Sequence, residues 1–193
     1  VLYGGSGNLT DNWAIFEATG GGTLTFDTSY DIEDYWDFGF VQVSTDGGYT
    51  WTSLSNNYTT ADYADGAHPK MVENVPGLTG WSGDWLTMNF DLGAYAGQDI
   101  LIAFRYVTDW ATVYDGWYID NVYVDDTLIS NGSSTGPFMD ITEVVPIDND
   151  FTVQLIGAVE KKDSAKFQVV PLPTDGTTED GDRANVANVF SKS

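Results

Sequence analysis

Four carboxylates lie within seven residues of the segment YDIEDYWDFGF, which begins at Tyr30. They are Asp31, Glu33, Asp34 and Asp37. Carboxylates this close repel one another unless a cation or hydrogen-bond donors lie among them. Only two basic residues, Lys70 and Arg105, occur in the first 130 residues. Most of the acids in the chain are Asp, which suits turns and hard-cation sites, and this bias favours a loop-rich protein that binds Ca²⁺.

A further acid lies inside a strand-like segment, GWYIDNVYV, that begins at Gly116. Asp120 has the same parity as Tyr118 and Val122, which predicts a carboxylate that points into an apolar layer. Such a group must be hydrogen-bonded or bound to a metal ion. Two interpretations follow: Asp120 binds Ca²⁺, or it bonds to Arg105 or to backbone amides at a β-bulge.

Most catalytic constellations are absent from the sequence. The chain contains no cysteine and one histidine, His68. It lacks both the HExxH motif of zinc peptidases and a Gly-x-Ser-x-Gly nucleophile turn. A pair of carboxylates acting on a glycosidic bond remains an alternative, because acids are abundant. The sequence therefore predicts a protein that is not an enzyme.

The charge restricts the possible partners. Twenty-nine acids against seven bases give a net charge of −22. Nucleic acid is excluded, because binding a polyanion needs clustered Lys and Arg, and an anionic membrane surface is disfavoured for the same reason. No stretch approaches the length of a membrane span, so no membrane insertion is expected. Sequons at Asn8, Asn57 and Asn131 agree with a secreted, extracellular or cell-surface location.

These acids must be positioned by strands, because period-two patterns separated by Gly, Asp and Asn dominate the chain. In residues 23–33, Leu24, Phe26 and Thr28 share one face with Tyr30 and Ile32. Further strands are predicted at 38–44, 49–54, 85–92, 99–107, 117–124, 151–159 and 166–172. This number and spacing of strands predict an all-β fold, a jelly-roll-type antiparallel β-sandwich with additional C-terminal strands.

The pattern of residue types along the chain changes after the segment Asn131–Gly136. We therefore expect a jelly-roll domain over residues 1–132. Residues 133–193 form a C-terminal β extension or a partial second domain, with a polar tail from Thr174.

Several blocks of the sequence together resemble a known family. They are LTFDTSYDIEDYWDFGFVQVSTDGG from Leu24, PGLTG from Pro76, FDLGAYAGQ from Phe90, FRYVTD from Phe104 and GWYIDNV from Gly116. In this order they resemble the non-catalytic β-sandwich domain of the immune inhibitor A family of secreted metallopeptidases, over residues 1–130.

The resemblance implies a jelly-roll-like fold related to MAM and carbohydrate-binding sandwiches. It also implies structural calcium and a place C-terminal to a zinc peptidase domain, which would lie outside this chain. Glu33, Asp37 and Asp120 lie on the family pattern and are the first candidate ligands. The further candidates are Asp31, Asp34 and Asp115.

The expected function is that of a calcium-stabilised accessory domain of a secreted or cell-surface protease-like protein. Its partner would be a neighbouring domain or a protein substrate. One alternative is a carbohydrate-binding module that uses exposed tryptophans to bind glycans. Another is a structural subunit of a surface layer or filament, in which the C-terminal strands drive self-association by strand addition.

Overall fold

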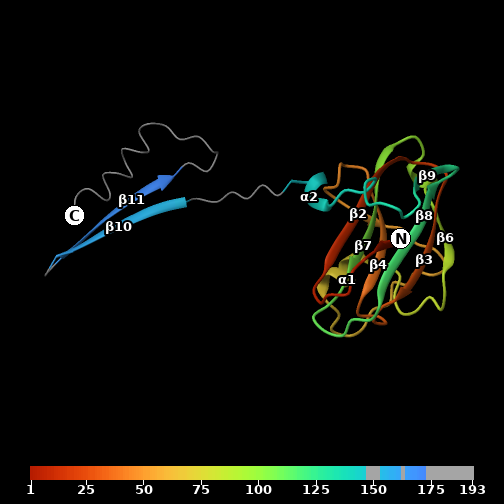
Figure 1. Ribbon diagram of the computed structural model, residues 1–193, viewed down its shortest axis with the longest axis horizontal. Coiled ribbons are helices and arrows are strands. Elements are labelled where there is room, and N and C mark those ends of the chain that lie inside the picture. Colours follow the sequence, from red (N-terminus) through yellow and green to blue (C-terminus); the bar gives the residue numbers. More distant parts are fainter. Residues whose placement is uncertain (147–152, 162–163, 173–193) are drawn as a thin grey trace. The chain divides into compact units, whose positions relative to one another are not determined.

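The computed structural model describes residues 1–146, 153–161 and 164–172 and confirms the all-β fold (Figure 1). The chain separates into two compact units, residues 1–146 and 147–193. The elements of the first unit are β1 (Leu2–Tyr3), β2 (Asp11–Thr19), β3 (Thr23–Asp31), β4 (Phe38–Ser44), β5 (Thr52–Ser53), α1 (Pro69–Asn74), β6 (Leu86–Asp91), a 3-10 turn (Gly93–Tyr95), β7 (Asp99–Val107), β8 (Gly116–Val124), β9 (Thr127–Ser130) and α2 (Ile141–Val144).

Two antiparallel sheets form the sandwich in the first unit. Sheet A has the order β1-β8-β3-β6, with β9 also paired to β8. Sheet B has the order β2-β7-β4-β5. The second unit contains the antiparallel pair β10 (Val153–Lys161) and β11 (Ser164–Leu172). The predicted polar tail from Thr174 lies outside the described residues.

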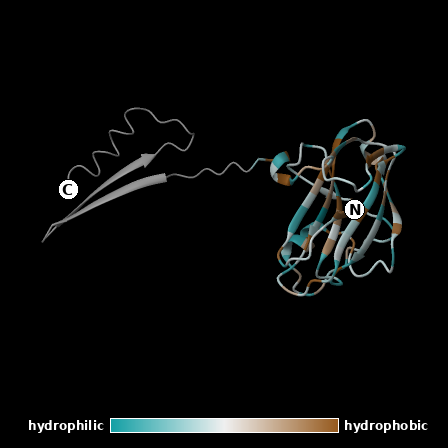
Figure 2. Ribbon diagram, viewed as in Figure 1, coloured by the Kyte–Doolittle hydropathy of each residue, from teal (hydrophilic) through white to brown (hydrophobic). Residues whose placement is uncertain are grey.

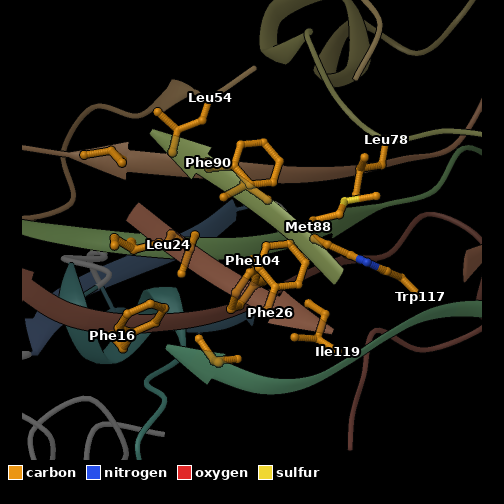
Figure 3. Close-up of a cluster of buried hydrophobic side chains, with 14 of the residues drawn as sticks. Phe16, Leu24, Phe26, Leu54, Leu78, Met88, Phe90, Phe104, Trp117 and Ile119 are labelled. Carbon is orange, nitrogen blue, oxygen red and sulfur yellow. The ribbon is translucent and has the colours of Figure 1, made fainter. Parts of the chain in front are cut away.

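The inner faces of the two sheets pack against each other through aromatic and aliphatic side chains. Along β3, burial alternates as predicted, with Leu24 and Phe26 fully buried. Phe104 on β7 lies at the centre of the core, with its ring centroid 4.9 Å from Phe26 and 5.9 Å from Trp117 (Figure 3). Figure 2 shows hydrophobic and hydrophilic residues interspersed along the sandwich strands, as expected for sheets with one covered face.

Sheet B is also covered on its outer face. Met71 of α1 packs on Phe38, Phe40 and Val107 in a second, smaller cluster. All residues of β4 are consequently buried. Among the described residues, no helix is long and apolar enough to cross a bilayer.

Four strands differ from their predictions, and two of them, the short β1 and β9, were not predicted. β2 was not predicted either, because its sequence DNWAIFEAT opens with two turn-forming residues and lacks regular alternation; only Ile15 and Phe16 are buried. The strand predicted at 49–54 shortens to β5. Gly47 and Gly48, both with positive φ, form the turn before β5, and Trp51 Nε1 donates a hydrogen bond to the Gly48 carbonyl.

The first unit continues past residue 132, where the sequence alone placed a domain boundary. The backbones of Ile15 and Met139 form a bridge at the edge of β2. Phe138 packs edge-on against Phe16 at 5.8 Å. Asp140 and Glu143 then form a capping box that begins α2. These contacts attach the segment before Pro146 to the sandwich.

A polar network occupies the outer face of sheet B beside α1. Arg105 donates two hydrogen bonds to the carboxylate of Asp11, at 2.7 and 2.9 Å, and its guanidinium lies 4.2 Å from the centroid of the Trp13 ring. Lys70 binds the same carboxylate at 2.7 Å. Burial opposes ionisation of Asp11, but the hydrogen bonds from Arg105 and Lys70 hold its pKa below the ordinary value. Both basic side chains of the first unit are thus paired with Asp11.

We expect Arg105→Lys to lower the free energy of unfolding by about 1–2 kcal/mol, because lysine loses the two-pronged hydrogen bond and the stacking on Trp13. Urea unfolding monitored by tryptophan fluorescence measures the change. Lys70→Gln is the matched control and should cost less than about 1 kcal/mol, since this lysine is half-exposed. Equal costs for the two variants would contradict the assignment.

Candidate metal centre

Glu33 and Asp37 are brought together by a tight turn between β3 and β4. The backbone N–H groups of Trp36 and Asp37 donate to the Glu33 carbonyl, at 3.2 and 3.0 Å. Tyr35 has a φ of 64°, and its N–H donates to the Thr79 hydroxyl. The Asp37 N–H to Glu33 carbonyl bond closes the turn and brings its two ends together. The turn therefore points both carboxylates at the same end of the sandwich.

Asp109 joins them from the neighbouring strand of sheet B. β7 runs antiparallel to β4, and Phe38 pairs with Val107. The residue before β4 and the residues after β7 therefore meet. The backbone N–H of Asp109 donates to Asp37 Oδ1 at 2.8 Å, and Asp109 Oδ1 accepts from the Ala111 N–H at 2.9 Å.

The three carboxylates form one compact cluster. One oxygen from each of Glu33, Asp37 and Asp109 lies within 4.8 Å of the other two. Asp37 is 0% exposed and Asp109 3% exposed. Asp37 Oδ2 and the nearby Tyr106 hydroxyl are buried without a hydrogen-bond partner among the described residues. A buried carboxylate oxygen without a protein partner can be satisfied by a cation or by an ordered water.

The pKa values of the cluster also indicate that no positive group within residues 1–146 balances the charges of these carboxylates. Burial raises the pKa of the Asp37 carboxyl to about 7, and the charges of Asp109 and Glu33 add to the shift. Burial and the charge of Asp109 also raise the pKa of Glu33. Burial and the charge of Asp37 raise the pKa of the Tyr106 hydroxyl. Without a cation, the site therefore favours protonated Asp37.

The spacing of these oxygens would allow one metal ion to bind all three carboxylates. Ca²⁺ binds oxygens at about 2.3–2.6 Å, so two ligands on opposite sides of the ion are about 4.8 Å apart. The three oxygens lie within this limit. Carboxylates are ligands for hard cations, and the carbonyls of a surface turn and water complete such a shell. Glu33, Asp37 and Asp109 are the residues that would hold the ion.

The same burial argues against catalysis by these acids. A general acid or base must reach the proton that it transfers, within hydrogen-bond distance of the substrate or through one water. Asp37 and Asp109 expose almost no surface, and Asp37 Oδ1 is already bonded to a backbone amide. The cluster is suited to binding an ion and stabilising the turn.

Of the six predicted ligands, the structure places two in this cluster, Glu33 and Asp37. Asp31, Asp34 and Asp115 are exposed. The backbone of Asp31 bridges to Trp81, the Asp34 carboxylate lies beside Gly80, and the Asp115 carbonyl accepts a long hydrogen bond from Tyr118. Asp31 is the last residue of β3, Asp34 and Asp115 lie in loops, and all three lie outside the buried cluster.

The sixth predicted ligand, Asp120, does not belong to the cluster, and the predicted orientation of its side chain is wrong. The buried residues of β8 with side chains on the inner face are Trp117, Ile119 and Val122, besides the buried Gly116, and Asp120 is 23% exposed on the outer face of sheet A. A β-bulge opposite β3, with Asn121 at a φ of 48°, shifts the alternation by one residue. Asp120 Oδ1 accepts the Asn121 N–H at 2.9 Å, which matches the bulge interpretation.

Asp109 was not predicted as a ligand, although it ends one of the blocks that carry the family resemblance. The positions of Asp37 and Asp109 relative to two predicted strands could have indicated that they are neighbours. Asp37 immediately precedes one buried strand, and Asp109 follows another by two residues. Antiparallel neighbours would bring these two ends together. Pairing of the strands is the information that the sequence pattern lacks.

Comparison with known proteins places this geometry in a family. Residues 8–140 match the family model for the immune inhibitor A-like MAM domain. The chain is 32% identical over 120 residues to the pre-pro-metalloprotease PrtV of Vibrio cholerae serotype O1, covering 60% of this chain and 12% of that protein. It is 27% identical over 126 residues to Bacillopeptidase F of Bacillus subtilis, covering 64% of this chain and 7% of that protein.

The matches span a small part of each relative. The family match, over residues 8–140, falls within the first unit. The matched region is the non-catalytic, MAM-like part of such proteins and contains no peptidase domain. The predicted resemblance is thereby confirmed: the chain belongs to the immune inhibitor A-like MAM domain family.

Proposed function

We propose that residues 1–146 act as an extracellular accessory module whose loop end is stabilised by one calcium ion. The observation that carries this proposal is the buried Asp37 carboxylate, whose Oδ2 has no partner in the described part of the chain and which lies beside two further carboxylates. A divalent cation would compensate these charges and would join the β3–β4 turn to the end of β7.

The role of the module is to stabilise or position a neighbouring domain, or to contact a protein substrate. Support comes from relatives that are named as a metalloprotease and a peptidase and in which the matched region is a minor part. The same relatives support a location outside the cell or at its surface. A rigid sandwich with a metal-ordered loop end suits such a role, because the loops at that end then keep one conformation.

Terbium luminescence tests the ion site. Tb³⁺ replaces Ca²⁺ at oxygen sites, and Trp36 and Trp110 adjoin the ligands in sequence, so excitation at the indole band should sensitise its emission. Added Ca²⁺ should displace Tb³⁺. Asp109→Asn and Glu33→Gln should each weaken binding at least about tenfold, because calcium affinity depends on the number of charged ligands.

Asp120→Asn is the matched control and should leave terbium emission and calcium competition unchanged. A loss of binding in this variant, with retention in Asp109→Asn, would move the site to β8 and overturn the proposed ligand set. Absence of sensitised emission from the unmodified protein, with no calcium heat in calorimetry, would overturn the calcium site itself.

A further inference from the structure

The outer face of sheet A carries a group of polar and aromatic side chains that is separate from the cluster of Glu33, Asp37 and Asp109. They line a shallow surface pocket of about 350 Å³. The lining residues come from β3, from β8 and from the start of β6: Asp27, Trp85, Leu86, Thr87, Asp120 and Asn121. The helices in Figure 1, α1 and α2, pack near sheet B and leave this face of sheet A open.

Strand pairing places the two carboxylates of this pocket side by side. Asp27 lies opposite Asp120 on one neighbour and opposite Thr87 on the other. Like charges directly opposite each other are destabilising in a sheet. Neither Lys70 nor Arg105, the two basic side chains of residues 1–146, reaches them, because both are paired with Asp11. The Val1 amino group lies 3.9 Å from Asp120 Oδ2.

The neutral side chains of the pocket orient Asp27. The Thr87 hydroxyl donates to Asp27 Oδ1 at 2.6 Å, and Asn121 Nδ2 donates to Asp27 Oδ2 at 2.9 Å. A carboxylate accepts about four hydrogen bonds, so each oxygen retains acceptor capacity. With Val1 near Asp120, the pocket is left with a surplus of acceptors, a net negative charge and the ring of Trp85, which is 47% exposed.

This combination fits a planar cation better than a sugar or a metal ion. A sugar hydroxyl is neutral and would leave the charge of Asp27 without a cationic partner, since the Val1 amino group lies near Asp120 alone. A metal ion gains nothing from an aromatic ring. A guanidinium carries five donors and no acceptor, pairs with two carboxylates and stacks on an indole face.

The charge of the whole unit is complementary to such a ligand. Residues 1–146 contain twenty-one acids and two bases. A field of one sign attracts an oppositely charged partner and raises the rate of encounter. We infer that the pocket of Asp27, Asp120 and Trp85 binds an arginine side chain of a protein partner. This inference does not depend on the calcium site.

An NMR titration of the whole chain, at one fixed calcium concentration, tests the inference. The probe is the capped tripeptide acetyl-Gly-Arg-Gly-amide. Saturable shifts are expected at the Trp85 indole N–H and the amides of Thr87 and Asn121. The same peptide with citrulline, which keeps the shape and removes the charge, should bind at least about tenfold more weakly. Higher salt should also weaken binding.

Two variants and a matched control locate the binding to this pocket. Asp120→Asn and Trp85→Ala should each weaken the arginine peptide about threefold to tenfold. Asp99→Asn removes one exposed charge from sheet B and should change the affinity less than about twofold.

Three outcomes would overturn the inference. The citrulline peptide could bind as tightly as the arginine peptide. Asp99→Asn could weaken binding as much as Asp120→Asn, which would indicate a general charge effect. A neutral oligosaccharide such as cellohexaose could shift the same amides at lower concentration than the arginine peptide, which would make the face a glycan site.

Discussion

In EGTA, the free energy of unfolding is expected to fall as the pH rises from about 4 to 7, by at most about 4 kcal/mol. The cause is Asp37, whose pKa is raised by burial from 3.8 to about 7 in the folded protein. Between these two values the folded state binds more protons than the unfolded state, so stability falls with pH across this window. Glu33, whose pKa is also raised, acts in the same direction.

The lowered pKa of Asp46 does not obscure the fall in stability caused by Asp37. Hydrogen bonds from Thr50 and Ser44 lower the pKa of Asp46 to about 2. The stability that Asp46 contributes is present above its ordinary value of 3.8 and is lost as the pH falls toward 2. Its window therefore lies below that of Asp37, and urea titrations at several pH values separate the two.

Calcium is expected to remove the fall. A bound ion holds the carboxylates ionised, and at about one hundred times its dissociation constant it stabilises the folded state by about 2.7 kcal/mol. Asp37→Asn should lose both the fall in EGTA and the response to calcium. Asp34→Asn, which neutralises the exposed acid three residues earlier, should keep both. A curve for the unmodified protein in EGTA that stays level or rises between pH 4 and 7 would contradict the assignment of Asp37.

The second large effect is expected in the core. Phe104→Ala should lower the free energy of unfolding by about 3–5 kcal/mol, because it leaves a cavity that the rigid sandwich cannot close. The Phe104 ring contacts those of Phe16, Phe26 and Trp117, at centroid distances of 6.0, 4.9 and 5.9 Å. Thermal and urea unfolding, followed by circular dichroism, measure the loss.

Tyr49→Ala is the control for this prediction, because Tyr49 is 77% exposed and its truncation should change stability by less than about 0.5 kcal/mol. A comparable loss in both variants would mean that Phe104 is not the centre of the core. A small loss in Phe104→Ala alone would mean that the two sheets pack more loosely than described.

Strands with regular alternation were predictable from the sequence. β3, β4 and β7 were found at the predicted positions, because their buried residues alternate or run continuously between Gly- and Asp-rich turns. β2 was missed because it lies at the edge of sheet B, where few of its residues are buried. Edge strands bury less surface, so their sequences carry a weaker pattern.

The candidate site was predictable in part. Glu33 and Asp37 stand out through local acid density, and a cation was the expected compensation. Asp109 enters through the pairing of β4 with β7, a contact between residues far apart in sequence. Asp120 was misplaced because a single bulge changes the face on which every later residue of the strand lies. The alternation of apolar and polar residues along a strand reveals neither the pairing register of the strand nor the position of a bulge.

The pairing of Met139 with Ile15 also determines where the chain can be shortened. Phe138 and Met139 line a cavity of about 210 Å³ together with Phe104 and Tyr106. A fragment ending at residue 132 would open this cavity and leave the edge of β2 unprotected. An unprotected edge with apolar neighbours pairs with other copies and aggregates. A fragment intended for expression should therefore end at or after Pro146, where the strand edge is still covered.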